Sequence, residues 1–177
     1  MIVLETPFKG LYEIELSRMG DNRGWFMRTF DLEIFQKNID GFDCTWKQMN
    51  HSFNLSKYTW RGFHYQESPY QETKLVRCIR GSVLDCVIDL RINSETYLKT
   101  FQLELSYKNG KMLYIPKGFA HGFLTLEDNV ELTYLHDEYY RPDFEKGIRY
   151  NDPKIDFSLP FQPLIISERD KKHLNII

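Results

Sequence analysis

The sequence has few cysteines and no concentration of basic charge, and both absences narrow its function. Its three cysteines, Cys44, Cys78 and Cys86, are odd in number and widely spaced, so they predict neither a disulfide framework nor a metal knuckle. We expect all three to be core or incidental thiols. The net charge is −2 and there is no run of lysine or arginine, which argues against binding to nucleic acid or to a membrane surface. A small-molecule ligand is expected instead.

Long hydrophobic runs are also missing. No apolar stretch approaches the length of a transmembrane helix, and Glu5 interrupts the apolar start of the chain too early for a signal peptide. We therefore expect a cytoplasmic protein. The 177 residues have an ordinary balance of apolar and charged types, so we expect residues 1–177 to form one domain with a sizeable core.

Short runs in which apolar and polar residues alternate fill most of the chain, and this pattern is typical of antiparallel strands with one buried face. The run from Ser82 to Arg91 places Leu84, Cys86, Ile88 and Leu90 on one side and Val83, Asp85, Val87 and Asp89 on the other. Similar runs cover residues 11–17, 25–30, 44–52, 74–79, 100–106, 112–115 and 130–136. This number of strands predicts an all-β, two-sheet barrel, a fold that often holds one small ligand in its mouth.

Turns and helix starts add local detail. Asn109-Gly110 predicts a type I′ hairpin, and Arg80-Gly81 a second tight connection. Asp31 is a candidate N-cap for a short helix that ends near Asn38, and Ser167 begins a capping box that opens a C-terminal helix. Helices are expected to be few and short.

Three segments carry residues suited to chemistry. His64 lies in the strand-like run from Arg61 to Gln66, and taken alone it is better explained as a hydrogen-bonded core histidine than as a catalytic one. Lys74 precedes apolar residues, and a lysine on an inward face needs an anionic partner, which a substrate oxyanion would provide. The segment from Pro116 to Phe123 contributes His121, and Tyr134 follows on the next apolar run.

A transition metal is not expected. The spacing of Pro116, Gly118 and His121 resembles the second motif of the cupin barrels, whose first motif normally holds two histidines and a glutamate. Here Gln66 stands where the second histidine would be, and an amide oxygen is a weak ligand compared with an imidazole. We predict that the barrel is metal-free.

A series of motifs makes the resemblance more specific. These motifs are, in chain order, Asp21-x-Arg23-Gly24-x-Phe26, Gln48-x-Asn50-x-Ser52, Arg61-Gly62-x-His64-Tyr65-Gln66, Lys74-Leu75-Val76, Asp89-x-Arg91-x-x-Ser94-x-Thr96, Ile115-Pro116-x-Gly118-Phe119-Ala120-His121-Gly122-Phe123, Tyr134, Tyr139-Tyr140-x-Pro142, Asn151-Asp152-Pro153 and Ser167-x-Arg169-Asp170. With these motifs the chain resembles the dTDP-4-dehydrorhamnose 3,5-epimerase family over nearly its whole length.

This resemblance implies a cupin-type double-stranded β-helix, also called a jelly roll, and a cofactor-independent isomerase. His64 would be the general base, oriented by Asp170, and Tyr134 the acid on the opposite face of the sugar. Lys74 would stabilise the enolate at C4, with His121 near the same oxygen. The rest of the nucleotide sugar would contact Tyr140, which stacks on the base, and Arg23, Gln48, Asn50, Arg61, Glu145 and Arg169.

Proton chemistry explains why these residue types are needed. A proton beside a ketone is far less acidic than an imidazolium, so a histidine base works only if the developing enolate charge is stabilised where it forms. Inversion also requires proton return on the face opposite removal, which calls for a second group such as a phenol. The resemblance further implies a homodimer that exchanges N-terminal strands, with Arg23 and Arg28 reaching the partner's site.

Several alternatives stay open. Asp170 is also explained as a capping-box residue, and Tyr134 as a cross-strand aromatic. Arg28 replaces the family's usual glutamate, so the nucleotide could be dTDP, GDP or CDP, and inversion could involve C3, C5 or both. A non-catalytic sugar-binding cupin and a metal-dependent cupin enzyme are further alternatives. We expect the remaining histidines, His51, His136 and His173, to be structural or solvated.

Overall fold

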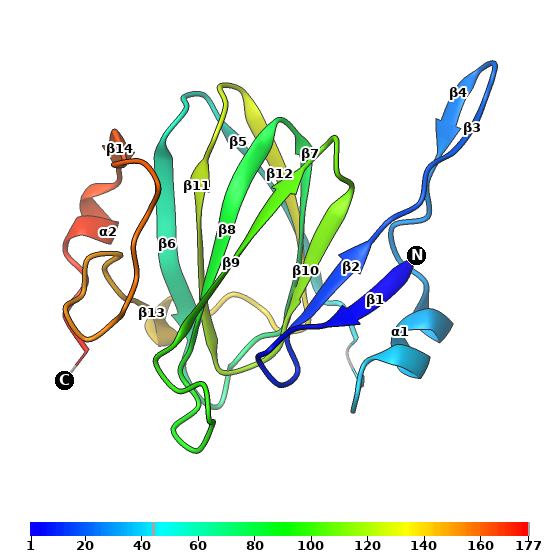
Figure 1. The fold of residues 1–177 in the computed structure, drawn as a ribbon. Helices are drawn as coiled ribbons and strands as arrows, with labels where there is room; N and C mark the ends of the chain where they lie inside the picture. The colour runs from blue at the N-terminus through cyan, green and yellow to red at the C-terminus, as the bar shows by residue number, and fades with distance from the viewer. Residues whose placement is uncertain (44, 177) are drawn as a thin grey trace.

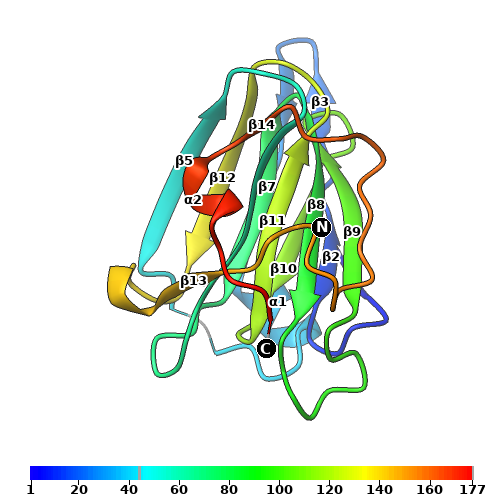
Figure 2. The ribbon, with the colours of Figure 1, turned by 90° about the vertical axis from the view of Figure 1, so that its left-hand side faces the viewer.

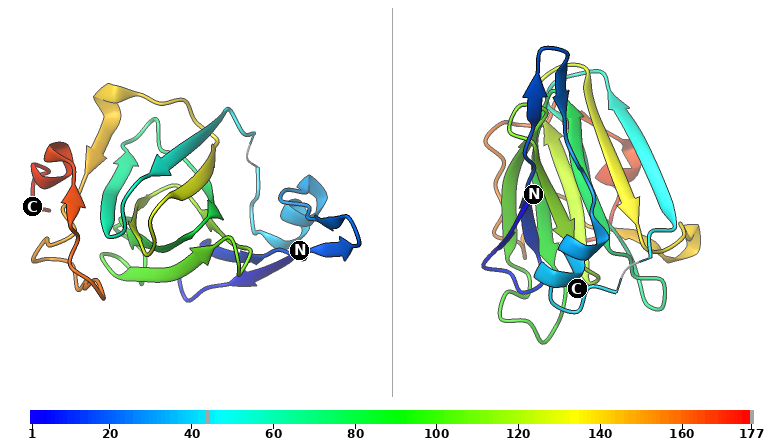
Figure 3. Two further views of the ribbon diagram at one scale, coloured as in Figure 1. Left: turned by 90° about the horizontal axis from the view of Figure 1, so that it is seen from above. Right: turned by 90° about the vertical axis from the view of Figure 1, so that its right-hand side faces the viewer.

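Two β-sheets pack face to face in the computed structural model, which describes residues 1–43 and 45–176. The first sheet has the order β1 (Ile2–Glu5), β2 (Tyr12–Glu15), β10 (Lys111–Ile115), β7 (Lys74–Arg80), β12 (Val130–His136) and β5 (Gln48–Asn54). The second has the order β13 (Glu145–Gly147), β6 (Thr59–Gln66), β11 (Phe119–Thr125), β8 (Ser82–Asp89) and β9 (Thr100–Ser106), and β14 (Ile165–Ile166) pairs with β6. Viewed end-on, the sheets curve around a common interior (Figures 1 and 3). The predicted all-β, two-sheet barrel is confirmed.

The sheets bury apolar side chains on both faces. Between them lies a core that includes Val83, Val87 and Leu132. The outer face of the first sheet is covered by helix α1 (Leu32–Asn38), whose Phe35 belongs to a second core. The outer face of the second sheet is covered by the C-terminal part of the chain (Figure 2). There Trp60 of β6 packs in a third core with Ile148 and Ile155. The alternation predicted for the run from Ser82 is therefore confirmed: Val83 and Val87 face the interior, whereas Cys86 and Ile88 face the C-terminal covering.

Both predicted helix starts are confirmed. Asp31 is the N-cap of α1, and its carboxylate accepts a hydrogen bond from the backbone N–H of Ile34 at 3.3 Å. Ser167 is the N-cap of α2 (Glu168–Lys171), and its hydroxyl accepts one from the N–H of Asp170 at 3.0 Å. Apart from one short 3₁₀ turn, η1 (Pro142–Phe144), these are the helices of the described part of the chain, and none of them is long and apolar enough to cross a membrane.

Most predicted strands are present, with some corrections to their ends. Strands β7, β9, β10 and β12 match their predicted ranges to within one residue, whereas β2 is shorter than residues 11–17. Of residues 25–30, only the first two belong to a strand, β4 (Gly24–Phe26), which forms a projecting hairpin with β3 (Met19–Asp21) (Figure 1). Strand β5 begins at Gln48 rather than at Cys44, which lies outside the described residues. The other two cysteines are free and buried, as expected.

The predicted hairpin at Asn109-Gly110 is wrong. A type I′ turn needs a positive φ at both central residues, but only Gly110 has one, at 65°. The flanking strands β9 and β10 belong to different sheets, so the turn carries the chain from one sheet to the other. Arg80-Gly81 does form the expected tight connection, with Gly81 at a φ of 73°, and it also links the two sheets.

Candidate active site

A cavity of about 450 Å³ opens into the barrel and is lined by polar side chains from both sheets. The first sheet contributes residues of β5, β7 and β12, and the second contributes residues of β6, β11 and β13. The lining residues are Gln48, Asn50, Ser52, Arg61, His64, Tyr65, Gln66, Glu72, Lys74, His121, Phe123, Tyr134, His136, Tyr140 and Glu145.

Strands β6 and β11 approach closely at the point where they carry their histidines. Gly62 has a φ of 135°, and a Cβ added there would lie 2.4 Å from the Cα of Gly122, so a larger residue at position 62 would push the strands apart. Beside this contact, His64 and His121 are direct register partners. The two glycines therefore allow both imidazoles to reach the same cavity.

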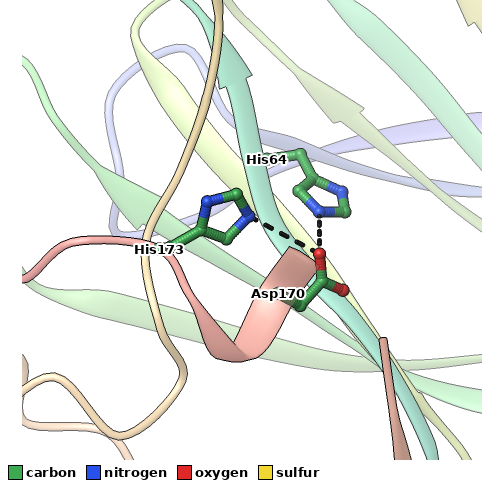
Figure 4. A group of neighbouring side chains, drawn as sticks. All are labelled: His64, Asp170 and His173. Atoms are coloured by element: carbon green, nitrogen blue, oxygen red, sulfur yellow. Dashed lines mark hydrogen bonds and ion pairs between the residues drawn. The ribbon is translucent and has the colours of Figure 1, made fainter. Parts of the chain in front are cut away.

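His64 is hydrogen-bonded to a buried carboxylate. Its Nε2 lies 2.7 Å from Oδ1 of Asp170 (Figure 4), and Oδ2 of Asp170 accepts the backbone N–H of Gly62 at 3.2 Å. Burial opposes ionisation of Asp170, but its hydrogen bond and charge interaction with His64 outweigh this and lower the pKa of the carboxyl. Because a carboxylate only accepts, Nε2 of His64 carries the shared proton and Nδ1 is left to take up another.

The capping-box alternative for Asp170 accounts for its backbone only. The N–H of Asp170 donates to the hydroxyl of Ser167, the N-cap, whereas the carboxylate is directed at His64 and Gly62 instead of back toward the cap. The cap thus holds the first turn of α2 in the position from which the carboxylate reaches β6.

Lys74 forms a buried charged cluster at the cavity wall. Its ammonium lies 3.0 Å from Oε1 of Glu72 and donates to the backbone carbonyl of His64 at 3.4 Å. The other oxygen of Glu72 lies 2.8 Å from Nδ1 of His136. Burial opposes ionisation of Glu72, but Lys74 and His136 together lower its pKa to about 2. The cavity therefore contains a cation held by a permanent carboxylate, close to the candidate base.

Tyr134 is a half-buried phenol. Its hydroxyl lies 2.8 Å from the hydroxyl of Ser52, and burial raises its pKa well above the usual value. Nε2 of His121 lies 2.9 Å from Oδ1 of Asp85, whose pKa is raised by burial although the charges of His121 and Lys74 oppose this. Tyr134 on the first sheet and His64 on the second thus line the same cavity.

The residues expected to hold a nucleotide fall into two groups. Gln48, Asn50, Arg61, Tyr140 and Glu145 line the cavity, and Arg169 forms an ion pair with Glu145 at its rim.

The second group lies elsewhere. Arg23 is on the projecting hairpin, pairs with Asp21 and has an 85% exposed side chain. Arg28 pairs with Asp31 at the start of α1. Neither arginine lines the cavity of its own chain.

Sequence reasoning missed two residues of the cavity wall. His136 was expected to be structural or solvated; it contacts Glu72, and it also lines the cavity. Glu72 was not singled out at all. Strand alternation was the available signal, since each lies two residues from a chosen site residue, His136 after Tyr134 and Glu72 before Lys74.

Gln66 is already engaged with the backbone. Its amide nitrogen donates to the carbonyls of Tyr70 and Tyr139, and its oxygen accepts the N–H of Arg141 at 2.6 Å.

Among the described residues, one group of side chains could bring ligands to a metal: His64, Asp170 and His173, whose ligating atoms lie within 4.8 Å of one another.

Comparison with known proteins identifies close relatives. Residues 5–176 match the family model described as dTDP-4-dehydrorhamnose 3,5-epimerase. The enzyme of that name from Escherichia coli (strain K12) is 39% identical over 97% of this chain and 92% of its own. A dTDP-4-dehydrorhamnose 3-epimerase from Streptomyces niveus is 31% identical over 94% of this chain and 79% of its own.

A solved structure agrees with these sequence matches. The crystal structure of the 3,5-epimerase from Bacillus anthracis, with TDP and PPi bound, superposes with a TM-score of 0.94 at 32% identity and covers 99% of both chains. This similarity supports the cupin-type jelly roll that the motifs implied.

Proposed function

Because the chain belongs to the dTDP-4-dehydrorhamnose 3,5-epimerase family and is therefore an isomerase of nucleotide-linked sugars, we propose that it inverts C3 and C5 of a dTDP-linked 4-keto-6-deoxyhexose. The observation that carries the proposal is the position of three groups around one cavity. His64 comes from the second sheet, Tyr134 and Lys74 come from the first, and all three line the same 450 Å³ space.

His64 is the proposed general base. Its Nδ1 takes the proton from the carbon next to the C4 ketone, while Asp170 holds the ring through Nε2 and stabilises the imidazolium that forms. The electrons of the C–H bond move to the C4 oxygen, and the ammonium of Lys74 stabilises the enolate with His121 beside it. Tyr134 then returns a proton to carbon from the opposite face, which inverts the centre.

The reaction consists of proton transfers alone, so we propose that it uses no cofactor. We assign the nucleotide end of the substrate to Gln48, Asn50, Arg61, Tyr140 and Glu145, with Arg169 at the rim. The open mouth of the cavity beside Tyr140 leaves room for a base to stack on its ring.

Inversion of C3 alone is the second candidate. It is favoured by the match to the Streptomyces niveus enzyme, whose name specifies a 3-epimerase. The chemical groups would be the same, and the difference would lie in whether the sugar can be presented to His64 through C5 as well as through C3.

We also propose a homodimer that exchanges N-terminal strands. Large apolar side chains on the β3–β4 hairpin are exposed, with Trp25 at 44% and Phe26 at 62%, and a projecting apolar hairpin is suited to packing against a second subunit. The same hairpin carries Arg23.

We propose that residues 1–177 act as one domain and that the enzyme works in the cytoplasm, where cells keep the nucleoside triphosphates from which nucleotide sugars are made.

The test is incubation with dTDP-4-keto-6-deoxyglucose in deuterated water, followed by NMR of the sugar. Deuterium at C3 and C5 with inversion at both is the expected result. Label at C3 alone would establish the second candidate. Absence of label with this sugar would contradict the proposal, and the GDP and CDP counterparts would then show whether the nucleotide alone had been assigned wrongly.

A further inference from the structure

A second imidazole lies beside the proposed base and has no role in the mechanism above. His173 follows α2 by two residues, and its Nε2 lies 3.5 Å from Oδ1 of Asp170, the same oxygen that His64 contacts at 2.7 Å (Figure 4). The two rings are 5.8 Å apart and nearly perpendicular, at 76°. Two histidines that are far apart in the sequence therefore converge on one carboxylate oxygen.

The position of His173 is fixed by the backbone of β13. Its side chain is only 14% exposed, and a Cβ added at Gly147 would lie 2.1 Å from its Nε2. A residue larger than glycine at position 147 would therefore displace the ring. Within the described residues, Nε2 of His173 is buried and has no hydrogen-bond partner, although an unpaired buried nitrogen is costly. The nearest charge that can offset this cost is Asp170.

We propose that His173 is a positioning residue that tunes the His64–Asp170 pair. The inference rests on the proposed function of His64 as the general base. In its neutral form His173 keeps Nε2 3.5 Å from the carboxylate oxygen that His64 contacts, and the electropositive edge of its ring offsets part of the charge of Asp170, which weakens the pull of Asp170 on the proton of His64. When His173 is protonated, its charge opposes the uptake of a proton by His64.

The charges around His173 are consistent with a neutral ring. Burial and the charge of His64 lower its pKa, and Arg169 acts in the same direction, whereas Asp170 opposes them. These groups come from β6 and α2, and β13 adds Glu145 and Lys146 nearby, of which Glu145 is already paired with Arg169.

Both effects act in one direction. Without His173, Asp170 interacts more strongly with the proton on His64, and no second imidazolium opposes protonation of the base. The free base is then lost at a higher pH. We expect the acid limb of the kcat/KM profile of His173→Ala to move upward by about half a pH unit, which corresponds to roughly a threefold change in the protonation equilibrium.

Two further variants separate tuning from packing. His173→Gln keeps an N–H donor near Asp170 but cannot be charged, so it should restore part of the shift. Gly147→Ala displaces the imidazole without removing it and should move the limb in the same direction as His173→Ala. Leu174→Ala is the matched control, because this neighbour is 82% exposed and uncharged, and its acid limb should coincide with that of the wild type.

The readouts distinguish the two proposals. If the wild type incorporates no deuterium into the sugar, the proposed function fails, whatever the variants do. If the wild type is active and His173→Ala changes only kcat, with its acid limb unmoved, His173 has a structural role and the inference is overturned. Titration of the ¹⁵N-labelled imidazoles by NMR gives the same decision without turnover, because His64 should protonate at a higher pH in His173→Ala.

Discussion

At the scale of single residues, the proposed base and the proposed acid lie in different environments. Asp170, the partner of His64, is a buried carboxylate that is kept ionised by His64, whereas Tyr134 is a phenol whose pKa is raised by burial. The proposed base therefore has an anionic partner, and the proposed acid holds its proton. This contrast of environments is the usual way in which enzymes assign the two roles at neutral pH.

Tyr134→Phe tests the proton donor. The variant keeps the ring and its packing but loses the hydroxyl that contacts Ser52. His64 can still remove and return a proton on its own face, so we expect deuterium exchange at C3 or C5 to continue while inversion falls about a hundredfold or more. NMR of the sugar in deuterated water measures both rates. Ser52→Ala, which keeps the phenol, is the control, and inversion by Tyr134→Phe at the wild-type rate would remove Tyr134 from the mechanism.

The lowered pKa of Glu72 predicts how the free energy of unfolding depends on pH. Its pKa is about 2 in the folded protein, below its ordinary value of 4.5, so its contribution is complete above the ordinary value and is lost as the pH falls through 2. A shift of this size corresponds to about 3 kcal/mol. We expect the free energy of unfolding in urea to fall more steeply below pH 4.5 for the wild type than for Glu72→Gln. Parallel curves would show that the pairing with Lys74 and His136 does not stabilise the fold.

At the scale of elements, the two helix N-caps are similar in structure, but only one of the two helices carries a residue of the proposed active site. Asp31 caps α1, which packs on the outer face of the first sheet, whereas Ser167 caps α2, which carries Asp170 to His64. Replacing either cap with alanine should lower stability by about 1 kcal/mol. We expect kcat to fall in Ser167→Ala but not in Asp31→Ala. Thermal unfolding and steady-state kinetics check this, and equal kcat values would mean that α2 holds Asp170 without its cap.

The sequence predicted some of these elements correctly and others wrongly. Strands such as β9 and β12 were placed correctly because alternation is a local property, and both N-caps were found for the same reason. The turn at Asn109-Gly110 was misread, because its type depends on which sheet the next strand joins, and two local residues do not encode that. The contact of His136 with Glu72 was missed because 64 positions separate the two residues.

At the scale of the whole molecule, the site depends on both ends of the chain. The C-terminal part covers the second sheet and delivers Asp170 to its inner edge, while the N-terminal part covers the first sheet and then projects away in the β3–β4 hairpin (Figures 1 and 2). The residue roles came from family resemblance, since spacing alone left Asp170 and Tyr134 open. The family resemblance implies that Arg23 contacts the nucleotide sugar. In a single chain, however, this arginine is exposed and lies outside the cavity of its own subunit.

Exchange of subunits decides whether Arg23 acts across a dimer. An Arg23→Ala subunit would fail to supply the arginine to its partner's cavity. A Lys74→Met subunit would instead lack the enolate-stabilising lysine in its own cavity, which should lower kcat about a hundredfold or more. In a mixed dimer the Arg23→Ala subunit keeps its lysine and receives an intact Arg23 from the Lys74→Met subunit. One complete site is thereby rebuilt.

Co-expression of the two variants should therefore recover activity, up to about a quarter of the wild-type value if subunits pair at random and each dimer has two independent sites. Each variant expressed alone should stay low. A double variant that carries both changes in one chain, co-expressed with the wild-type chain, is the control. Under random pairing it should leave about a quarter of the wild-type activity if Arg23 acts across the dimer, and about half if Arg23 acts within its own chain. Recovery in the first mixture together with a quarter in the second requires Arg23 to act on the neighbouring subunit. A protein that remains monomeric by light scattering, or a first mixture no more active than its parts, would contradict the exchanged dimer.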